Sequence, residues 1–138
     1  IKLPTLVINF LKMFKIKSQV EVTRKEEWYQ KHGKFKLLFD DFLKEQVKDV
    51  LSLVLFGSYA KGTATRKSDL DILLISKTEL GIDKITKELY AKYGKEINAI
   101  LMNSNDLRKQ KDKTLIKEVI KDHYVLYGVE KFVDLVFK

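Results

Sequence analysis

The chain has 138 residues, which suits a single domain with its own core. Its net charge of +8 favours anionic partners such as nucleotides, nucleic acid or an acidic protein, although a lysine-rich solvated surface explains the same charge. The absence of cysteine excludes disulfides, and the absence of a signal-peptide pattern or a membrane-spanning apolar run predicts a cytoplasmic protein without a membrane partner.

Residues 1–22 are predicted to be an N-terminal extension of uncertain role, ahead of a domain over residues 23–138. Within the extension, PTLVINFLKMF fits a short helix or a strand, and SQVEV alternates like a strand. TRKE, from Thr23, fits a capping box, so a helix is expected from there to about Val47, with Gly33 weakening its middle by about 1 kcal/mol. The large apolar residues of this helix are predicted to be core rather than a base-stacking platform: Trp28, Phe35, Leu38, Phe39, Phe42 and Leu43.

The remaining residues alternate between apolar strands and amphipathic helices. Strands are predicted over residues 50–56, 70–75 and 96–102, with a short edge strand near 123–128. Helices are predicted over residues 79–93, 104–110, from 112 onward, and 129–138. The first two strands are near-continuous apolar runs, which indicates strands covered on both faces. The order predicts a mixed α/β fold, a small mixed β-sheet flanked by helices.

Two acids, Asp69 and Asp71, stand at the start of the second strand. Because side chains alternate along a strand, both carboxylates point to the same face, about 6.6 Å apart at their Cα atoms. Such a pair can converge on one hard cation, and Mg²⁺ prefers one or two carboxylates together with water and substrate phosphates. The alternative is that these are solvated acids paired with lysines or arginines of the preceding loop.

The turn Gly57-Ser58 follows the first strand directly. Glycine lets backbone N–H groups approach a ligand closely, and a short helix starting here would add an anion site with the Ser58 hydroxyl. One strand end therefore offers a phosphate site and its neighbour a metal site. A nucleoside triphosphate carrying Mg²⁺ would occupy both sites at once. The alternative interpretation of Gly57-Ser58 is a tight turn without a binding role.

The whole stretch, GSYAKGTATRKSDLDILLI, resembles the DNA polymerase beta-like nucleotidyltransferase superfamily. It looks most like the minimal nucleotidyltransferases, some of which pair as antitoxins with an all-helical HEPN-domain protein. The resemblance rests on a glycine–serine pair followed, after ten residues, by Asp-x-Asp. It covers residues 53–75 closely and runs more loosely through 96–102 and the C-terminal tail.

This resemblance implies the nucleotidyltransferase fold and a two-metal transfer of a nucleoside monophosphate. It assigns triphosphate binding to Gly57 and Ser58, and Mg²⁺ binding and catalysis to Asp69 and Asp71. An acceptor hydroxyl attacks the α-phosphorus in such enzymes, and pyrophosphate leaves. Lys61 is a further candidate for neutralising phosphate charge.

This sequence departs from the family pattern at the third carboxylate, which in the family lies on the next strand. Asn98 stands at the matching position, and an amide is a poorer cation ligand and no general base. Glu96 lies two residues earlier on the same strand face, so both are candidate third ligands. The two histidines, His32 and His123, are predicted to take no part in catalysis.

The sequence favours two functions and leaves a third open. The first is Mg²⁺-dependent transfer of a nucleoside monophosphate from a nucleoside triphosphate, expected to be ATP, to a hydroxyl on a protein, an RNA end or a small molecule. The second, indicated by Asn98, is a catalytically weak antitoxin-like module that binds nucleotide and pairs with a HEPN-type protein. Nucleic-acid binding through the positive charge is a third interpretation, without a clear helix-turn-helix to support it.

Overall fold

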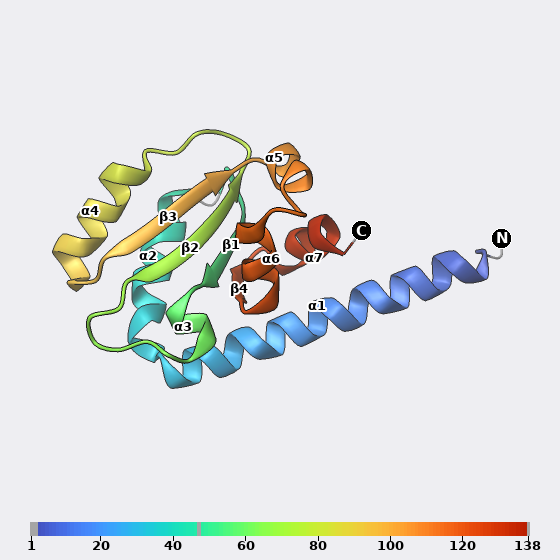
Figure 1. Cartoon of the computed structure of the whole chain (residues 1–138), viewed down its shortest axis with the longest axis horizontal. Coiled ribbons are helices and arrows are strands. Elements are labelled where there is room, and N and C mark those ends of the chain that lie inside the picture. The colour runs from blue at the N-terminus through green and yellow to red at the C-terminus, as the bar shows by residue number, and fades with distance from the viewer. Residues whose placement is uncertain (1–2, 47, 138) are drawn as a thin grey trace.

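The computed structural model describes residues 3–46 and 48–137 and shows a small sheet surrounded by helices (Figure 1). The elements in chain order are α1 (Thr5–Lys31), a 3₁₀ turn (Gly33–Phe35), α2 (Lys36–Gln46), β1 (Val50–Phe56), α3 (Ser58–Lys61), β2 (Leu70–Ser76), α4 (Ile82–Tyr93), β3 (Ile97–Met102), α5 (Ser104–Lys109), α6 (Thr114–Lys121), β4 (Tyr124–Tyr127) and α7 (Val129–Val136). The predicted mixed α/β class is confirmed.

The sheet has the strand order β3-β2-β1-β4. β1 pairs antiparallel with both β2 and β4, whereas β2 pairs parallel with β3. The sheet is therefore mixed, and β4 is an edge strand, as predicted. β1 and β2 lie in the middle, which explains why these two strands are the most continuously apolar in the sequence.

Apolar side chains pack on both faces of the sheet. Residues of α1, α2 and α4 pack on one face, where the largest buried groups are Trp28, Phe35, Leu38, Phe39, Phe42, Leu53, Leu55, Ile72 and Leu74. Residues of α5, α6 and α7 pack on the other face, with Val54, Leu73, Ile75, Leu107, Ile116, Val119, Phe132 and Leu135. Full burial of each such side chain stabilises the fold by about 1.5–3 kcal/mol relative to exposure.

The N-terminal helix differs from the prediction. α1 is one continuous helix from Thr5 to Lys31, so SQVEV is helical and the sequence TRKE lies inside the helix instead of opening it. No glycine or proline interrupts these residues, and Pro4 precedes the first turn, where its missing N–H costs nothing. The predicted helix over 23–47 is in fact broken at His32 and Gly33, and its last residue, 47, lies outside the described residues.

The break after α1 is fixed by aromatic packing. The ring of His32 stacks on Trp28, with 4.8 Å between centroids, and Phe35 stacks on the same indole at 6.0 Å. Burial, and then the charges of Lys34 and Lys31, lowers the pKa of His32, which keeps the stacked ring neutral. Because this stacking holds both sides of the break, the chain turns at Gly33 and α2 packs on the sheet.

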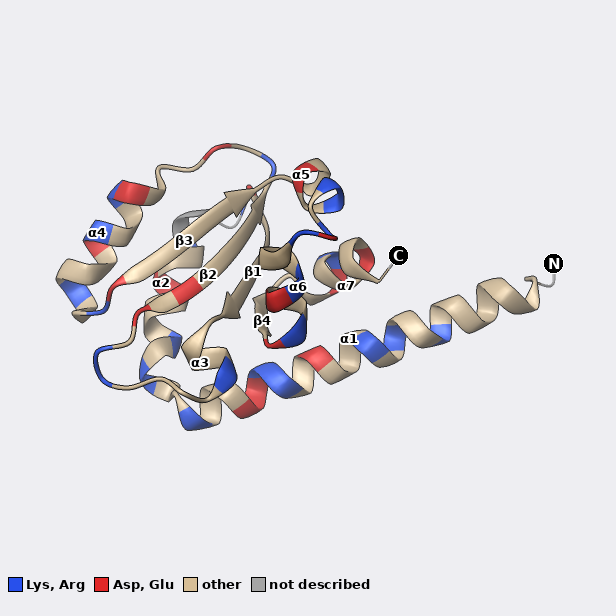
Figure 2. Cartoon of the chain, viewed as in Figure 1, with Lys and Arg blue, Asp and Glu red and all other residues tan. Residues whose placement is uncertain are grey.

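Charged residues lie on the helices and loops, and the strands are uncharged except around the start of β2 and of β3 (Figure 2). Lysines are spread over several helices rather than gathered in one arm. Within the described residues, no helix, α1 included, combines the length and the apolar character that a bilayer-spanning helix needs.

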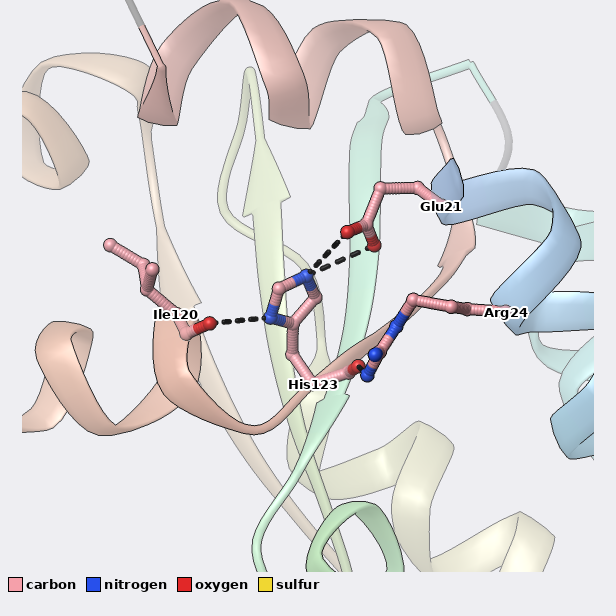
Figure 3. Close-up of polar contacts among 4 residues, drawn as sticks. All are labelled: Glu21, Arg24, Ile120 and His123. Carbon is pink, nitrogen blue, oxygen red and sulfur yellow. Dashed lines mark hydrogen bonds and ion pairs between the residues drawn. The ribbon is translucent and has the colours of Figure 1, made fainter. Parts of the chain in front are cut away.

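A buried polar contact joins α1 to the start of β4 (Figure 3). His123 Nε2 lies 3.0 Å from both carboxylate oxygens of Glu21, and His123 Nδ1 lies 2.9 Å from the carbonyl oxygen of Ile120. Arg24 donates from Nη2 to the His123 carbonyl oxygen at 2.7 Å. The two ring nitrogens of His123 thus face oxygen atoms of α1 and of α6, so the contact fixes α1 against the start of β4. His123 thus has a structural role.

Candidate active site

Three neighbouring strands bring the sequence-predicted residues into one row. Phe56, the last residue of β1, pairs with Asp71 of β2, and Asp71 pairs with Asn98 of β3. Adjacent strands lie about 4.8 Å apart. The turn that follows Phe56 therefore lies directly beside Asp71.

The turn at Gly57 needs glycine for two reasons. Its φ of 70° and ψ of −151° lie in a region that residues with a Cβ rarely adopt. A Cβ at this position would also collide with Oδ2 of Asp71. The backbone of the turn and the carboxylate of Asp71 are thus in close contact, and only glycine permits it.

Gly57→Ala is expected to weaken nucleotide binding, because the added methyl group must displace either the turn or the Asp71 carboxylate. We expect the affinity for ATP to fall by at least about tenfold, together with a loss of stability of about 1–3 kcal/mol. Isothermal calorimetry and urea denaturation measure the two effects. The matched control is Gly62→Ala, a glycine that also has a positive φ, 78°, but lies in the left-handed helical region and has open space around the added Cβ. Equal affinities of the two variants would contradict the role expected for Gly57.

The turn rests on the aromatic core below it. Ser58 opens the single turn of α3, and the buried ring of Tyr59 follows it. Trp28 donates from its indole nitrogen to the Tyr59 carbonyl oxygen at 3.3 Å. The positions of the turn and of Ser58 are therefore set by core packing rather than by a free loop.

Asp69 and Asp71 face the same side of the sheet, as the strand alternation predicts. The amide nitrogen of Asn98 lies 3.2 Å from Oδ2 of Asp69 and 3.2 Å from Oδ1 of Asp71, so one amide donates to both acids. Two carboxylate oxygens thus converge on one point, and this donor set fits a hard divalent cation. Rotation of the Asn98 amide would turn its oxygen toward the same point.

A cleft of about 330 Å³ opens beside this cluster, lined by Phe56, Gly57, Lys61, Asp71, Asn98, Ile100 and Glu118. Its volume is within the range of small-molecule sites. The structure therefore brings together Gly57, Lys61, Asp71 and Asn98 in one cavity, with Asp69 bound to the same amide.

The sequence profile of the nucleotidyltransferase domain matches residues 38–127. That match spans most of the chain and includes every residue of the candidate site. The chain belongs to the nucleotidyltransferase family. Its members transfer nucleotides from nucleoside triphosphates, and they generally use a divalent metal.

Curated relatives agree with this family. The "Putative protein adenylyltransferase MJ1305" of Methanocaldococcus jannaschii is 33% identical over 107 residues, covering 69% of this chain and 73% of the relative. The similarly named MJ0604 of the same organism is 38% identical over 80 residues, covering 56% and 79%. This nucleotidyltransferase is thus similar to proteins named for transfer of AMP to protein.

Two solved structures share the fold. One is described as a toxin-antitoxin with AMP-PNP, with a TM-score of 0.56, 20% identity and coverage of 72% of this chain and 77% of that one. The other is described as a mutant of the toxin-antitoxin MntA-HpeT, with a TM-score of 0.55, 19% identity and coverage of 71% and 77%. At these identities the similarity shows the nucleotidyltransferase fold.

The two candidate third ligands of this nucleotidyltransferase differ in position. Asn98 lies in the row of the acids, whereas Glu96 is exposed ahead of β3, where its carbonyl oxygen accepts the Leu70 N–H at 3.0 Å. Among residues 3–46 and 48–137, no group of three or more acids, histidines or cysteines is placed to hold a metal ion. The pair Asp69 and Asp71 therefore has the amide of Asn98 as its neighbour in place of a third acid.

Sequence reasoning missed Glu118 and Lys95. Glu118 lies on the exposed side of α6 and lines the cleft opposite the sheet, and no motif marks it. Lys95 donates to the carbonyl oxygens of Ser68 at 2.5 Å and Arg66 at 3.3 Å, so it fixes the loop that leads into Asp69. Both residues come from elements far along the chain, and only the packing shows their relation to the site.

Proposed function

We propose that this chain transfers AMP from ATP to a hydroxyl group of a protein, with Mg²⁺ as the metal. The observation that carries the proposal is the single cleft in which the Gly57 turn, Lys61 and the acid of Asp71 meet. The names of the curated relatives support a protein acceptor. Cytoplasmic ATP is the expected source of the nucleotide.

Each residue then has a distinct task. Gly57 and Ser58 would place backbone N–H groups and a hydroxyl against the triphosphate, and Lys61, at the cleft wall, would offset phosphate charge. Asp69 and Asp71 would hold Mg²⁺, with the Asn98 amide turned to present its oxygen. When bound, the metal would polarise phosphoryl oxygens and stabilise the charge that develops on them.

The proposed transfer is an in-line displacement at the α-phosphorus of ATP. The oxygen of the acceptor hydroxyl forms a bond to the α-phosphorus, the bond from that phosphorus to the bridging oxygen breaks, and pyrophosphate leaves. The hydroxyl proton passes to a base. Asp71 and Glu118 are the carboxylates that line the cleft and have the chemistry to accept it.

The direct test uses ATP labelled on the α-phosphate. We expect the purified chain to label protein from a cell extract in the presence of Mg²⁺, with the label resistant to washing under denaturing conditions. ATP labelled on the γ-phosphate should leave no label, because pyrophosphate is the leaving group. Labelling from the γ-phosphate, or labelling that persists in the double variant Asp69→Asn, Asp71→Asn, would contradict the proposal.

Asn98 favours a second candidate, a weakly active antitoxin-like module that binds nucleotide and pairs with a HEPN-type protein. An amide at the position of the third acid is a poorer metal ligand and is no base. The solved toxin-antitoxin structures that share the fold support a protein partner. In this case, binding to the partner would be the function, and transfer would be slow or absent.

Asn98→Asp distinguishes the two candidates. If the chain is an active enzyme, the added charge beside Asp69 and Asp71 should change the transfer rate by less than about tenfold, because the native site already works with the amide. If the chain is instead the weakly active antitoxin-like module, transfer should appear, or its rate should rise by at least about 100-fold, once a third acid is present. The rate of labelling from ATP, measured for both proteins at equal Mg²⁺, decides between them.

A further inference from the structure

The sheet holds the two acids of the candidate site unequally. Asp71 lies inside β2, where it pairs with Phe56 on one side and with Asn98 on the other. Asp69 precedes the first residue of β2 and lies outside this strand pairing, at the end of the loop 62–69 between α3 and β2 (Figure 1). The Asn98 amide contacts its carboxylate, but the backbone of Asp69 depends on contacts outside the sheet.

Those contacts come from the two residues that precede β3. The ammonium group of Lys95 donates to the carbonyl oxygen of Ser68 at 2.5 Å. The carbonyl oxygen of Glu96 accepts the N–H of Leu70 at 3.0 Å. Two consecutive residues thus hold the backbone on both sides of Asp69, and Lys95 does so through its side chain.

The same ammonium group lies against the segment that carries the Gly57 turn. Lys95 Nζ is 5.0 Å from the centroid of the Tyr59 ring, which is within the range of a cation–π contact. Tyr59 lies only two residues after Gly57. Because Lys95 Nζ also donates to the carbonyl oxygen of Arg66 at 3.3 Å, one side chain joins the loop before Asp69 to the turn proposed to bind the triphosphate.

Lys95 stands outside the cleft itself. It is not among the described residues that line the cleft, which include Lys61. Lys95 is half-buried, and its ammonium group donates to two backbone carbonyl oxygens. Any effect of Lys95 on a bound nucleotide should therefore pass through Asp69 rather than through direct contact with a phosphate.

We propose that Lys95 is a positioning residue, which holds the backbone of Asp69 so that its carboxylate stays beside Asp71 and the Gly57 turn when Mg²⁺ and a triphosphate bind. This inference rests on the proposed function, since it assumes that Asp69 helps to hold the metal. Residues that orient metal-binding side chains from outside typically change metal affinity by about 10- to 100-fold when they are replaced. Loss of the Lys95 hydrogen bonds should therefore weaken Mg²⁺ binding and leave the contacts of the turn in place.

The test compares Lys95→Met with the unchanged chain in calorimetric titrations of ATP at a series of Mg²⁺ concentrations. Methionine packs on an aromatic ring but donates no hydrogen bond. We expect the Mg²⁺ concentration for half-maximal ATP binding to rise by at least about tenfold, and saturating Mg²⁺ to restore the affinity. Lys95→Arg should stay within about threefold of the unchanged chain, because a guanidinium also donates to carbonyls and stacks on rings. The matched control, Lys87→Met on the exposed side of α4, should change binding by less than about twofold.

Two comparisons separate positioning from a general attraction between Lys95 and phosphate. Lys61→Met removes a cation from the cleft wall, so its loss of ATP affinity should persist at saturating Mg²⁺. Lys95→Met added to Asp69→Asn should lower the affinity by less than about twofold beyond Asp69→Asn alone, because two residues that act through one contact are not additive. A loss in Lys95→Met that saturating Mg²⁺ does not reverse, or a full additional loss in the double variant, would overturn the proposal.

Hydrogen exchange of the chain without nucleotide or metal gives an independent readout. The N–H groups of Ser68 and Leu70 are hydrogen-bonded to the carbonyl oxygens of Thr65 and Glu96. Both should exchange faster in Lys95→Met, whereas exchange in β1 and α7 should stay unchanged, which also shows that the variant is folded. Equal exchange of these two groups in both chains would overturn the positioning role. Absence of ATP binding by the unchanged chain would instead overturn the proposed function, and the exchange rates would still decide whether Lys95 holds the loop.

Discussion

Replacing Asp71 with Asn is expected to lower the rate of nucleotide transfer by about 100-fold or more. Asp71 is the acid that both lines the cleft and contacts the Gly57 turn. The substitution keeps the size of the side chain but removes one of the two charges that would hold the metal, and metal stabilisation of phosphoryl charge is worth several kcal/mol. Labelling of protein from ATP, followed over time, measures the loss.

The matched control for Asp71→Asn is Asp83→Asn, which removes a carboxylate of the same size from the exposed first turn of α4. Its rate should stay within about twofold of the unchanged chain, since it lies outside the cleft. Excess Mg²⁺ should restore part of the rate of Asp71→Asn if the loss is one of metal affinity. A rate for Asp71→Asn equal to that of Asp83→Asn would remove Asp71 from the site.

The largest effect on stability is expected for His123→Leu. This change leaves the carboxylate of Glu21 buried without its partner, and both residues are only 6% exposed. Removing the partner of a buried carboxylate costs roughly 3–5 kcal/mol, because the remaining charge is no longer compensated. Urea denaturation measures this loss as a lower free energy of unfolding. The slope of that free energy against urea concentration should stay unchanged.

Two further variants show whether the cost comes from the uncompensated charge. The double variant Glu21→Leu, His123→Leu should be more stable than His123→Leu alone by at least about 1 kcal/mol, since apolar replacement of a whole buried pair is often neutral. Glu21→Gln should lose less than His123→Leu, because its amide can donate to a neutral Nε2. If the double variant were the least stable of the three, loss of packing rather than charge would be the cause.

The sequence was sufficient to predict the central part of the fold. The continuous apolar runs of β1 and β2 predicted strands covered on both faces, and the two core clusters on opposite faces confirm it. The alternation along β2 predicted that Asp69 and Asp71 share a face, and their common contact with Asn98 confirms that as well. These predictions succeeded because they depend on the geometry of single strands and of a single turn.

The predictions that failed depend on contacts between distant segments. The helix break at His32 follows from the stacking of His32 and Phe35 on Trp28, which no local pattern reports. The continuity of α1 was missed because its apolar residues lie all around its first turns, so no helical period stands out. Glu118 shares the cleft with Asp71 only because α6 packs beside β1, and it carries no motif of its own.

Calorimetric titration of ATP into the full chain, with Mg²⁺ and then with EDTA, tests the central claim most directly. We expect binding that requires Mg²⁺, that is lost in the double variant Asp69→Asn, Asp71→Asn, and that is retained in Asp83→Asn. Binding of equal strength with EDTA, or in the double variant, would contradict a site in which the Gly57 turn, Asp69 and Asp71 jointly hold a metal-bound triphosphate.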